Sequence, residues 1–207
     1  MLLEKVKSFV DQKKLFSPKE KILLAVSGGI DSVCMAVIFS KAQYSFSIAH
    51  CNFQLRGEES ELDEVFVRKL AELLNVPFYS KKFLTTDYAD DHRLSIQMAA
   101  RELRYQWFNE LREREKFNWI ATAHHHDDVV ETFFINMMRS SGISGFHGIL
   151  PKKDKLIRPL LFASREEIVS FIKENRIEYR EDKSNLESKY LRNRIRHQVL
   201  PVLKEIN

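Results

Sequence analysis

The stretch with the most distinctive chemistry is a loop of six residues, Ser27, Gly28, Gly29, Ile30, Asp31 and Ser32. Apolar runs over residues 21–26 and 33–39 flank it, which predicts a buried strand, a tight turn and a helix packed on a sheet. Glycine has no Cβ, so the N–H groups of this turn can approach a ligand closely. Because a helix start also carries partial positive charge, the loop is suited to bind a phosphate.

Asp31 is the only acidic side chain in this loop. A carboxylate beside a phosphate is repelled unless a cation lies between them, so we expect Mg²⁺ to be held by Asp31 and phosphate oxygens. The loop lacks the Gly-Lys-Ser/Thr ending of a Walker A motif. The alternative is an ordinary turn in which Asp31 or Ser32 caps the following helix.

Two further predicted strands, over residues 44–49 and 119–122, also end in polar residues. The second is followed by a run of three histidines and two aspartates. Ligands of open parallel sheets bind outside the carboxyl ends of the strands, so these residues should lie on one rim with the loop. The candidate rim residues are His50 and Asn52, as nucleotide ligands, together with His124 and Asp128.

The histidine and aspartate run allows three interpretations. Asp128 and Glu131 have the spacing of a capping box, so both could simply begin the helix predicted over residues 129–138. A transition-metal site, as in metal-dependent phosphohydrolases, is the second, although the other histidines show no matching spacing. In the third, Asp128 and Glu131 lie on one face of the helix and His124 lies near its start. All three would then be parts of a catalytic site.

Arginines in two predicted helices could meet phosphate groups. The helix predicted over residues 94–111 places Arg104 beside an apolar stripe, where it must snorkel to solvent or pair with an anion. Beside a triphosphate it could neutralise charge on a leaving pyrophosphate. The helix predicted over residues 186–200 carries Arg192, Arg194 and Arg196, which either contact RNA phosphates or form a solvated basic face.

These motifs resemble those of a known superfamily. The loop at residues 27–32 looks like the PP-loop of the N-type ATP pyrophosphatases, which cleave ATP between the α and β phosphates. The whole chain is similar to the catalytic domain of the tRNA(Ile)-lysidine synthetase family. That similarity is carried by residues 27–32, 50–56, 99–105, 121–132, 158–161 and 182–197. The family often has histidine where this chain has Phe53, so a polar role at that position is in doubt.

The resemblance implies a ligase that uses ATP and Mg²⁺. The C2 carbonyl of the wobble cytidine of an isoleucine tRNA with a CAU anticodon would be activated as an adenylate, and free lysine would displace AMP. Arg104 and His124 would stabilise the adenylation transition state, and Asp128 and Glu131 would orient the lysine amine or accept its proton. The arginines at positions 192, 194 and 196 would meet tRNA or pyrophosphate.

Rival functions within the superfamily need other residues. A tRNA thiolase would need a catalytic cysteine or a Cys-x-x-Cys motif, and Cys34 and Cys51 offer neither. An amide-forming synthetase, such as an NAD or GMP synthetase, would share the loop but not the arginine-rich ending. A non-catalytic nucleotide-binding module would bind the nucleotide without forming AMP.

Composition and order of elements predict the architecture. The 207 residues, 44% hydrophobic and 30% charged, suffice for a single α/β domain. Strands alternating with helices indicate a Rossmann-like open parallel sheet with helices on both faces. We expect a core over about residues 19–160 and a helical extension over about 161–207. This extension is basic, because residues 151–207 hold 14 lysines and arginines against 9 acidic residues.

Location and assembly follow from weaker signals. Few cysteines and no signal peptide predict a cytoplasmic protein, and no segment of the sequence is long and apolar enough to cross a membrane. The glycine-rich stretch over residues 140–148 is interpreted as a mobile loop or a plain connection. A homodimer is left open.

Overall fold

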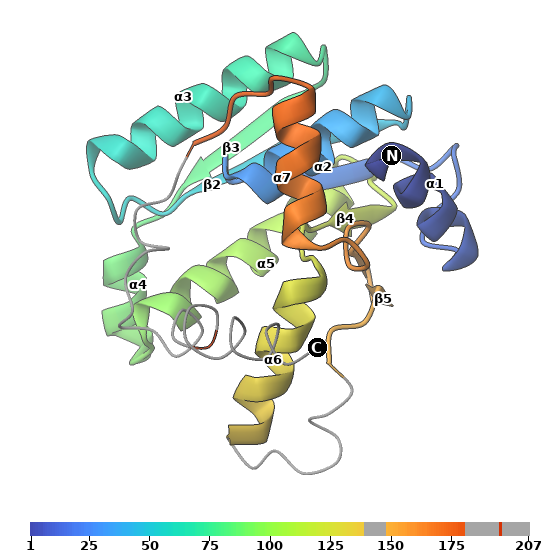
Figure 1. Ribbon diagram of the computed structural model, residues 1–207. Helices are drawn as coiled ribbons and strands as arrows, with labels where there is room; N and C mark the ends of the chain where they lie inside the picture. Colours follow the sequence, from blue (N-terminus) through green and yellow to red (C-terminus); the bar gives the residue numbers. More distant parts are fainter. Residues whose placement is uncertain (139–147, 181–194, 196–207) are drawn as a thin grey trace.

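The computed structural model describes residues 1–138 and 148–180, together with Ile195 (Figure 1). Its helices are α1 (Leu2–Gln12), α2 (Ile30–Lys41), α3 (Glu58–Leu73), α4 (Thr85–His92), α5 (Ile96–Arg114), α6 (His126–Met138) and α7 (Arg165–Glu174). Its strands are β1 (Ile22–Ala25), β2 (Phe46–Asn52), β3 (Phe78–Lys82), β4 (Trp119–Ala121), β5 (Lys152–Lys153) and β6 (Leu156–Ile157). The predicted helix over residues 186–200 and most of the predicted connection over 140–148 lie outside the described residues.

One sheet joins all six described strands, in the order β3-β2-β1-β4-β6-β5. The first five strands in this order run parallel, and only β5 pairs antiparallel, with β6. In the centre, Leu24 of β1 lies between Ile48 of β2 and Ala121 of β4. The predicted α/β fold with a parallel sheet is therefore confirmed, and the ends of β1 and β4 lie side by side.

Helices cover both faces of the sheet because β1 is apolar on both faces. Ile22 and Leu24 belong to a core shared with α1, α2, α3 and α7, whereas Leu23 points into a second core with Trp107 and Leu111 of α5. Figure 1 shows α5 on the opposite side of the sheet from α2 and α7. A central strand buried on both faces requires a continuous apolar run, as residues 22–26 show.

Two elements begin or end where the sequence pattern did not place them. Strand β2 continues to Asn52, so His50 and Asn52 lie within the strand instead of after it. Helix α6 begins at His126 instead of Val129. The carboxylate of Asp128 accepts a hydrogen bond from the backbone N–H of His125 (2.9 Å), so Asp128 lies inside the first turn and satisfies a free donor there. The predicted capping box that would begin at Asp128 is therefore wrong.

Shorter elements were missed. Helix α4 and the strands β5 and β6 have only eight, two and two residues, too few to give a clear periodicity. In the helix predicted over residues 94–111, the spacing of Ile96, Ala100, Leu103 and Trp107 places Ile96 on the apolar stripe, but Ile96 is exposed in the first turn of α5. Helix α7 contributes Ile168 and Phe171 to the main core, so the first part of the predicted C-terminal extension packs against α1 and α2.

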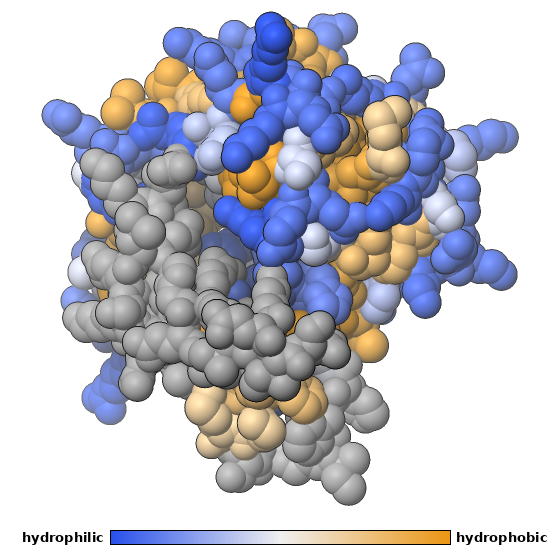
Figure 2. All heavy atoms as spheres, viewed as in Figure 1, coloured by the Kyte–Doolittle hydropathy of each residue, from blue (hydrophilic) through white to orange (hydrophobic). Residues whose placement is uncertain are grey.

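Helix α6 exposes several large hydrophobic side chains. Figure 2 shows hydrophilic side chains over much of the upper surface and a hydrophobic area low in the view, over the end of α6. Phe133, Met137 and Met138 of this helix are exposed. In the part of the chain that the structure describes, no helix combines the length and apolar character needed to cross a membrane.

Candidate active site

The loop over residues 27–32 folds back on itself at the start of α2. The hydroxyl of Ser32 donates to the carbonyl of Gly29 (2.9 Å) and accepts from the backbone N–H of Ser27 (3.2 Å). Gly28 has φ +99°, a conformation that L side chains rarely adopt. The glycine is thus required by the turn, and Gly29 forms the N-cap of α2 without a side chain over the helix end.

Asp31 extends from the first turn of α2 toward two other elements. Its Oδ1 accepts a hydrogen bond from Nη1 of Arg165, the first residue of α7. Its Oδ2 lies 3.9 Å from Nε2 of His125, which follows β4. Both side chains of the ion pair are part exposed, with 31% of Asp31 and 39% of Arg165 accessible. The carboxylate is therefore held by a cation from its own chain but remains open to solvent.

His125 connects Asp31 to the first turn of α6. Its Nε2 lies 3.7 Å from Oδ2 of Asp128, and its side chain is only 3% exposed. Two carboxylates from different helices thus flank one buried imidazole. In the described part of the chain its Nδ1 has no hydrogen-bond partner. Asp31, His125, Asp128 and Arg165 form a compact group, called the rim cluster below.

The rim cluster is held in place by the start of α7. The N–H of His126 donates to the carbonyl of Ala163 (2.9 Å), which joins the first turn of α6 to the residue before Ser164. Ser164 and Glu167 form a capping box at the start of α7. Glu167 also pairs with Lys5 of α1 at 2.5 Å. The backbone that carries Arg165 is therefore fixed from two sides.

His50 lies beneath the loop. Its Nδ1 lies 2.9 Å from the carbonyl of Val26, the residue before Ser27, so we assign the proton to Nδ1. The side chain is 3% exposed. Burial lowers the pKa of His50 below 6.5, because it disfavours the charged imidazolium. The described contacts make His50 a support for the loop backbone.

Asn52 is also buried, and its side chain is hydrogen-bonded within the protein. Its amide donates to Glu61 (3.2 Å) and Glu64 (3.1 Å) of α3, and its oxygen accepts from the N–H of Gln54 (3.1 Å). The residue is 1% exposed. Asn52 thus fixes α3 against the end of β2, and nucleotide binding by Asn52 or His50 stays a prediction.

An ion-pair network around the buried Asp63 ties the segment after α7 to the loop. Asp63 of α3 accepts from Arg56 (2.6 Å) and from Nε of Arg180, and Arg180 also binds Glu59 (2.5 Å). The backbone N–H of Arg180 donates to the carbonyl of Gly28 (3.0 Å). Since Asp63 is 7% exposed, this network anchors the loop from the side of α3.

Arg104 of α5 extends its guanidinium toward Phe53, the residue that follows β2. Its guanidinium stands 5.2 Å from the centre of the Phe53 ring, which stacks on Phe83 at 5.5 Å. Phe53 is thus an apolar platform, in keeping with the doubt about a polar role there. Snorkelling, one of the two alternatives for Arg104, is observed in a modified form. The part-exposed guanidinium lies over the face of an aromatic ring.

The remaining predicted residues are placed as follows. Nδ1 of His124 lies 2.9 Å from the hydroxyl of Thr122, and the side chain is part exposed. Glu131 is fully buried one turn after Asp128 on α6. Arg192, Arg194 and Arg196 lie outside the described residues.

A divalent cation fits this site only with help from a ligand. No group of three or more histidine, cysteine or acidic side chains within residues 1–138 and 148–180 is arranged to hold a metal. This gives no support to the phosphohydrolase interpretation. Mg²⁺ commonly takes one or two carboxylates together with substrate phosphates, so Asp31 could serve as its protein ligand.

Neither cysteine is prepared for sulfur chemistry. Burial raises the pKa of Cys34 and of Cys51 to about 12, so both are thiols at neutral pH. The two are on opposite faces of the sheet, in separate cores. The chemistry of a thiolase is therefore not supported by these residues.

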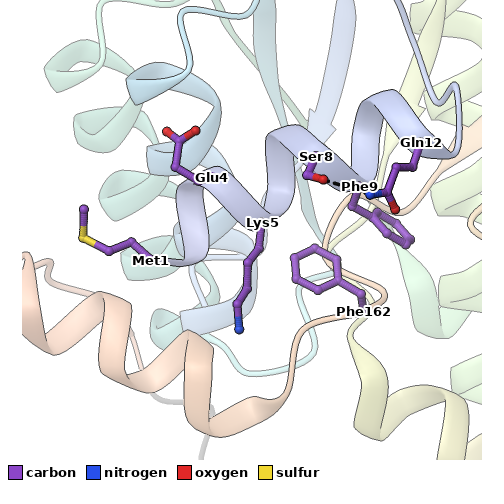
Figure 3. Close-up of a pocket in the computed structure, with 7 residues that line it drawn as sticks. All are labelled: Met1, Glu4, Lys5, Ser8, Phe9, Gln12 and Phe162. Carbon is purple, nitrogen blue, oxygen red and sulfur yellow. Dashed lines mark hydrogen bonds between the residues drawn. The ribbon is translucent and has the colours of Figure 1, made fainter.

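A hollow of about 470 Å³ lies elsewhere, along the outer side of α1 (Figure 3). Its lining is Met1, Glu4, Lys5, Ser8, Phe9, Gln12 and Phe162. Phe9 and Phe162 face each other at 4.9 Å and supply its apolar floor. None of the four rim-cluster residues lines the hollow.

Sequence reasoning missed three residues of the site. His125 was passed over in favour of His124, because nothing in a run of histidines tells which one is buried. A helix that begins near Arg165 is predicted from the sequence, but no local pattern shows that this helix start lies on the rim. Arg180 has no local signal, since its partner Asp63 is 117 residues away.

Comparison with known proteins places the chain. Residues 2–203 match the PP-loop domain family. A tRNA(Ile)-lysidine synthase of Bacteroides thetaiotaomicron is 44% identical over 207 residues, which cover 100% of this chain and 49% of that protein. The enzyme of Petrotoga mobilis is 39% identical, covering 99% of this chain and 67% of that protein. The chain spans about half the length of most curated relatives it matches.

Solved structures agree on the fold. The U34-tRNA thiolase NcsA of Methanococcus maripaludis superposes with a TM-score of 0.78 at 19% identity, covering 98% of this chain and 72% of that one. The NH3-dependent NAD synthetase of Campylobacter jejuni gives 0.62 at 14% identity, covering 98% and 83%. The chain belongs to the PP-loop domain family and, within it, to the family of the tRNA(Ile)-lysidine synthases.

Proposed function

We propose that this chain joins lysine to the wobble cytidine of an isoleucine tRNA with a CAU anticodon, at the expense of ATP. The supporting observation is the rim cluster. In it, Oδ2 of Asp31, in the loop over residues 27–32, lies 3.9 Å from Nε2 of His125, which follows β4. Membership of the lysidine synthase family supports the same reaction. The cytidine O2 would attack the α phosphate of ATP and release pyrophosphate. The ε-amine of lysine would then attack C2, and the oxygen would leave with AMP.

The ATP phosphates would lie on the loop. The N–H groups at the start of α2 and its partial positive charge favour an anion there. Asp31 would bind Mg²⁺, whose charge would be shared with the phosphate oxygens. Gly28 and Gly29 carry no side chain, so their backbone N–H groups could approach the phosphates closely.

The acceptor half of the reaction would take place beside α6. The lysine amine must be neutral to attack, so a carboxylate that binds and deprotonates it is required. Asp128 and Glu131 lie three residues apart on one face of α6, and Asp128 adjoins His125. His124, part exposed next to Thr122, and Arg104, on its Phe53 platform, would stabilise charge in the adenylation step.

The RNA would be held by the basic C-terminal part of the chain. Residues 151–207 contain 14 lysines and arginines against 9 acidic residues. Arg192, Arg194 and Arg196 are the candidates for phosphate contacts. Arg180, hydrogen-bonded to the loop at Gly28, would connect this part to the nucleotide site. A single catalytic domain and a cytoplasmic location are part of the same proposal.

Labelled lysine and ATP test the proposal. We expect the protein to incorporate lysine into a transcript with a CAU anticodon and to form one AMP and one pyrophosphate per lysine. A transcript with uridine at the wobble position is the matched control and should accept none. Formation of ADP and phosphate, or AMP formation that ignores lysine and RNA, would contradict the assignment.

A further inference from the structure

We propose that Arg165 is a phosphate-binding residue that Asp31 holds until the nucleotide arrives. When Mg²⁺ occupies Asp31, the Arg165 guanidinium moves from the carboxylate to the phosphate tail. This inference rests on the proposed use of Mg²⁺ and ATP, and it adds a ligand that the loop itself does not contain. The argument uses the position, the charge and the solvent access of the pair.

The position of Arg165 runs against the usual preference of helix ends. Arg165 is the first residue of α7, where the helix dipole disfavours a cation and favours acids such as the following Glu166 and Glu167. An arginine at such a place needs an anion close by. In the present structure Asp31 is that anion.

The backbone under Arg165 is fixed while its guanidinium is free to turn. The capping box of Ser164 and Glu167, and the ion pair of Glu167 with Lys5, hold the start of α7. The charged end of Arg165 sits on a long side chain that is 39% exposed. A rotation about side-chain bonds can therefore redirect the guanidinium without moving the helix.

Charge makes the exchange necessary. Asp31 carries one negative charge, its Oδ1 is bonded to Arg165 and its Oδ2 faces His125. Mg²⁺ and a guanidinium on the same carboxylate repel each other, so Mg²⁺ binding releases Arg165. A released guanidinium beside a polyphosphate forms paired, charge-assisted hydrogen bonds, for which arginine has the best geometry.

The exchange predicts two opposite effects of one substitution. In Arg165→Gln, we expect the affinity for ATP with Mg²⁺ to fall about 10- to 100-fold, since charge-assisted phosphate bonds are lost. Mn²⁺ alone, used as a spectroscopic probe of the Mg²⁺ position, should bind about 3- to 10-fold more tightly, because its competitor for Asp31 is gone. Arg165→Lys should keep more of the ATP affinity than the glutamine variant.

Two controls separate this role from packing and from the overall reaction. Lys173→Gln removes an exposed cation from the last turn of the same helix, and it should change neither binding constant. Equal ATP affinity in Arg165→Gln and the parent chain, or a parallel loss of ATP and Mn²⁺ binding, would overturn the inference. These titrations need neither lysine nor RNA. A parent chain that binds Mg·ATP but forms no lysidine would contradict the proposed function alone, whereas one that binds no ATP would overturn both.

Discussion

The rim has two halves that carry similar residues and use them differently. At β1 and β4, Asp31 and Arg165 are part exposed, and we propose that they exchange partners when Mg²⁺ binds. At β2, His50 and Asn52 are buried and bonded within the protein. A polar residue at the end of a parallel strand is therefore a candidate ligand only if its hydrogen-bonding capacity is still available. Substitutions in the first half should affect chemistry, and those in the second half should affect stability.

The largest effect is expected at Asp31. Asp31→Asn keeps the size of the side chain but removes the charge that would bind Mg²⁺, so AMP formation should fall at least about 100-fold. Because the ion pair with Arg165 is part exposed, the free energy of unfolding should change by less than about 1 kcal/mol. Pyrophosphate release and urea unfolding measure the two. Activity within about threefold of the parent chain would remove Asp31 from the site.

A loss of stability is expected at Asp63, the buried carboxylate of α3. Asp63→Asn leaves Arg56 and Arg180 without their shared carboxylate, which should lower the free energy of unfolding by about 2 kcal/mol. Arg176→Ala removes an exposed arginine from the segment that also carries Arg180, and should cost less than about 0.5 kcal/mol. Urea denaturation of both variants gives the comparison. Equal stabilities would mean that the network does not anchor the segment.

A pH effect should come from His50. Its folded-state pKa lies below 6.5 because burial disfavours the imidazolium, whereas the unfolded chain takes up a proton near 6.5. The contribution of neutral His50 to the free energy of unfolding is fully present above pH 6.5. It is lost as the pH falls from 6.5 toward the lowered pKa, by at most about 1.4 kcal/mol per pH unit. In urea titrations between pH 5 and 7, His50→Asn should reduce the slope of the free energy of unfolding against pH. The reduction should be on the order of 1.4 kcal/mol per pH unit at most. An unchanged slope would contradict the assignment.

The smallest effect is expected beneath Arg104. Phe53→Leu removes the aromatic face that carries the guanidinium and should cost about 1 kcal/mol of stability. Arg104 keeps its charge, so AMP formation should fall only about threefold, on the order of 0.6 kcal/mol. Steady-state AMP formation checks this. A loss as large as that of Asp31→Asn would mean that Phe53 takes part in the site directly.

Local patterns were enough to predict the elements around the loop. β1, the loop and α2 follow from apolar runs and adjacent glycines within a short window. The start of α6 was predicted three residues too late. Its first residues, a histidine and two aspartates, are polar and give no apolar helical spacing. The pairs Arg165–Asp31 and Arg180–Asp63 span 134 and 117 residues, so no local pattern contains them. The tertiary fold decides which side chains contact the loop. It also decides that His50 and Asn52 are buried and hydrogen-bonded within the protein.

The most direct test of the central claim is a crystal structure with Mg²⁺ and an ATP analogue that cannot be cleaved between the α and β phosphates. We predict phosphate oxygens on the N–H groups of residues 28–32, Mg²⁺ on Asp31 and the Arg165 guanidinium on the phosphates. Phosphates bound away from this loop, with Asp31 and Arg165 still paired, would contradict the account.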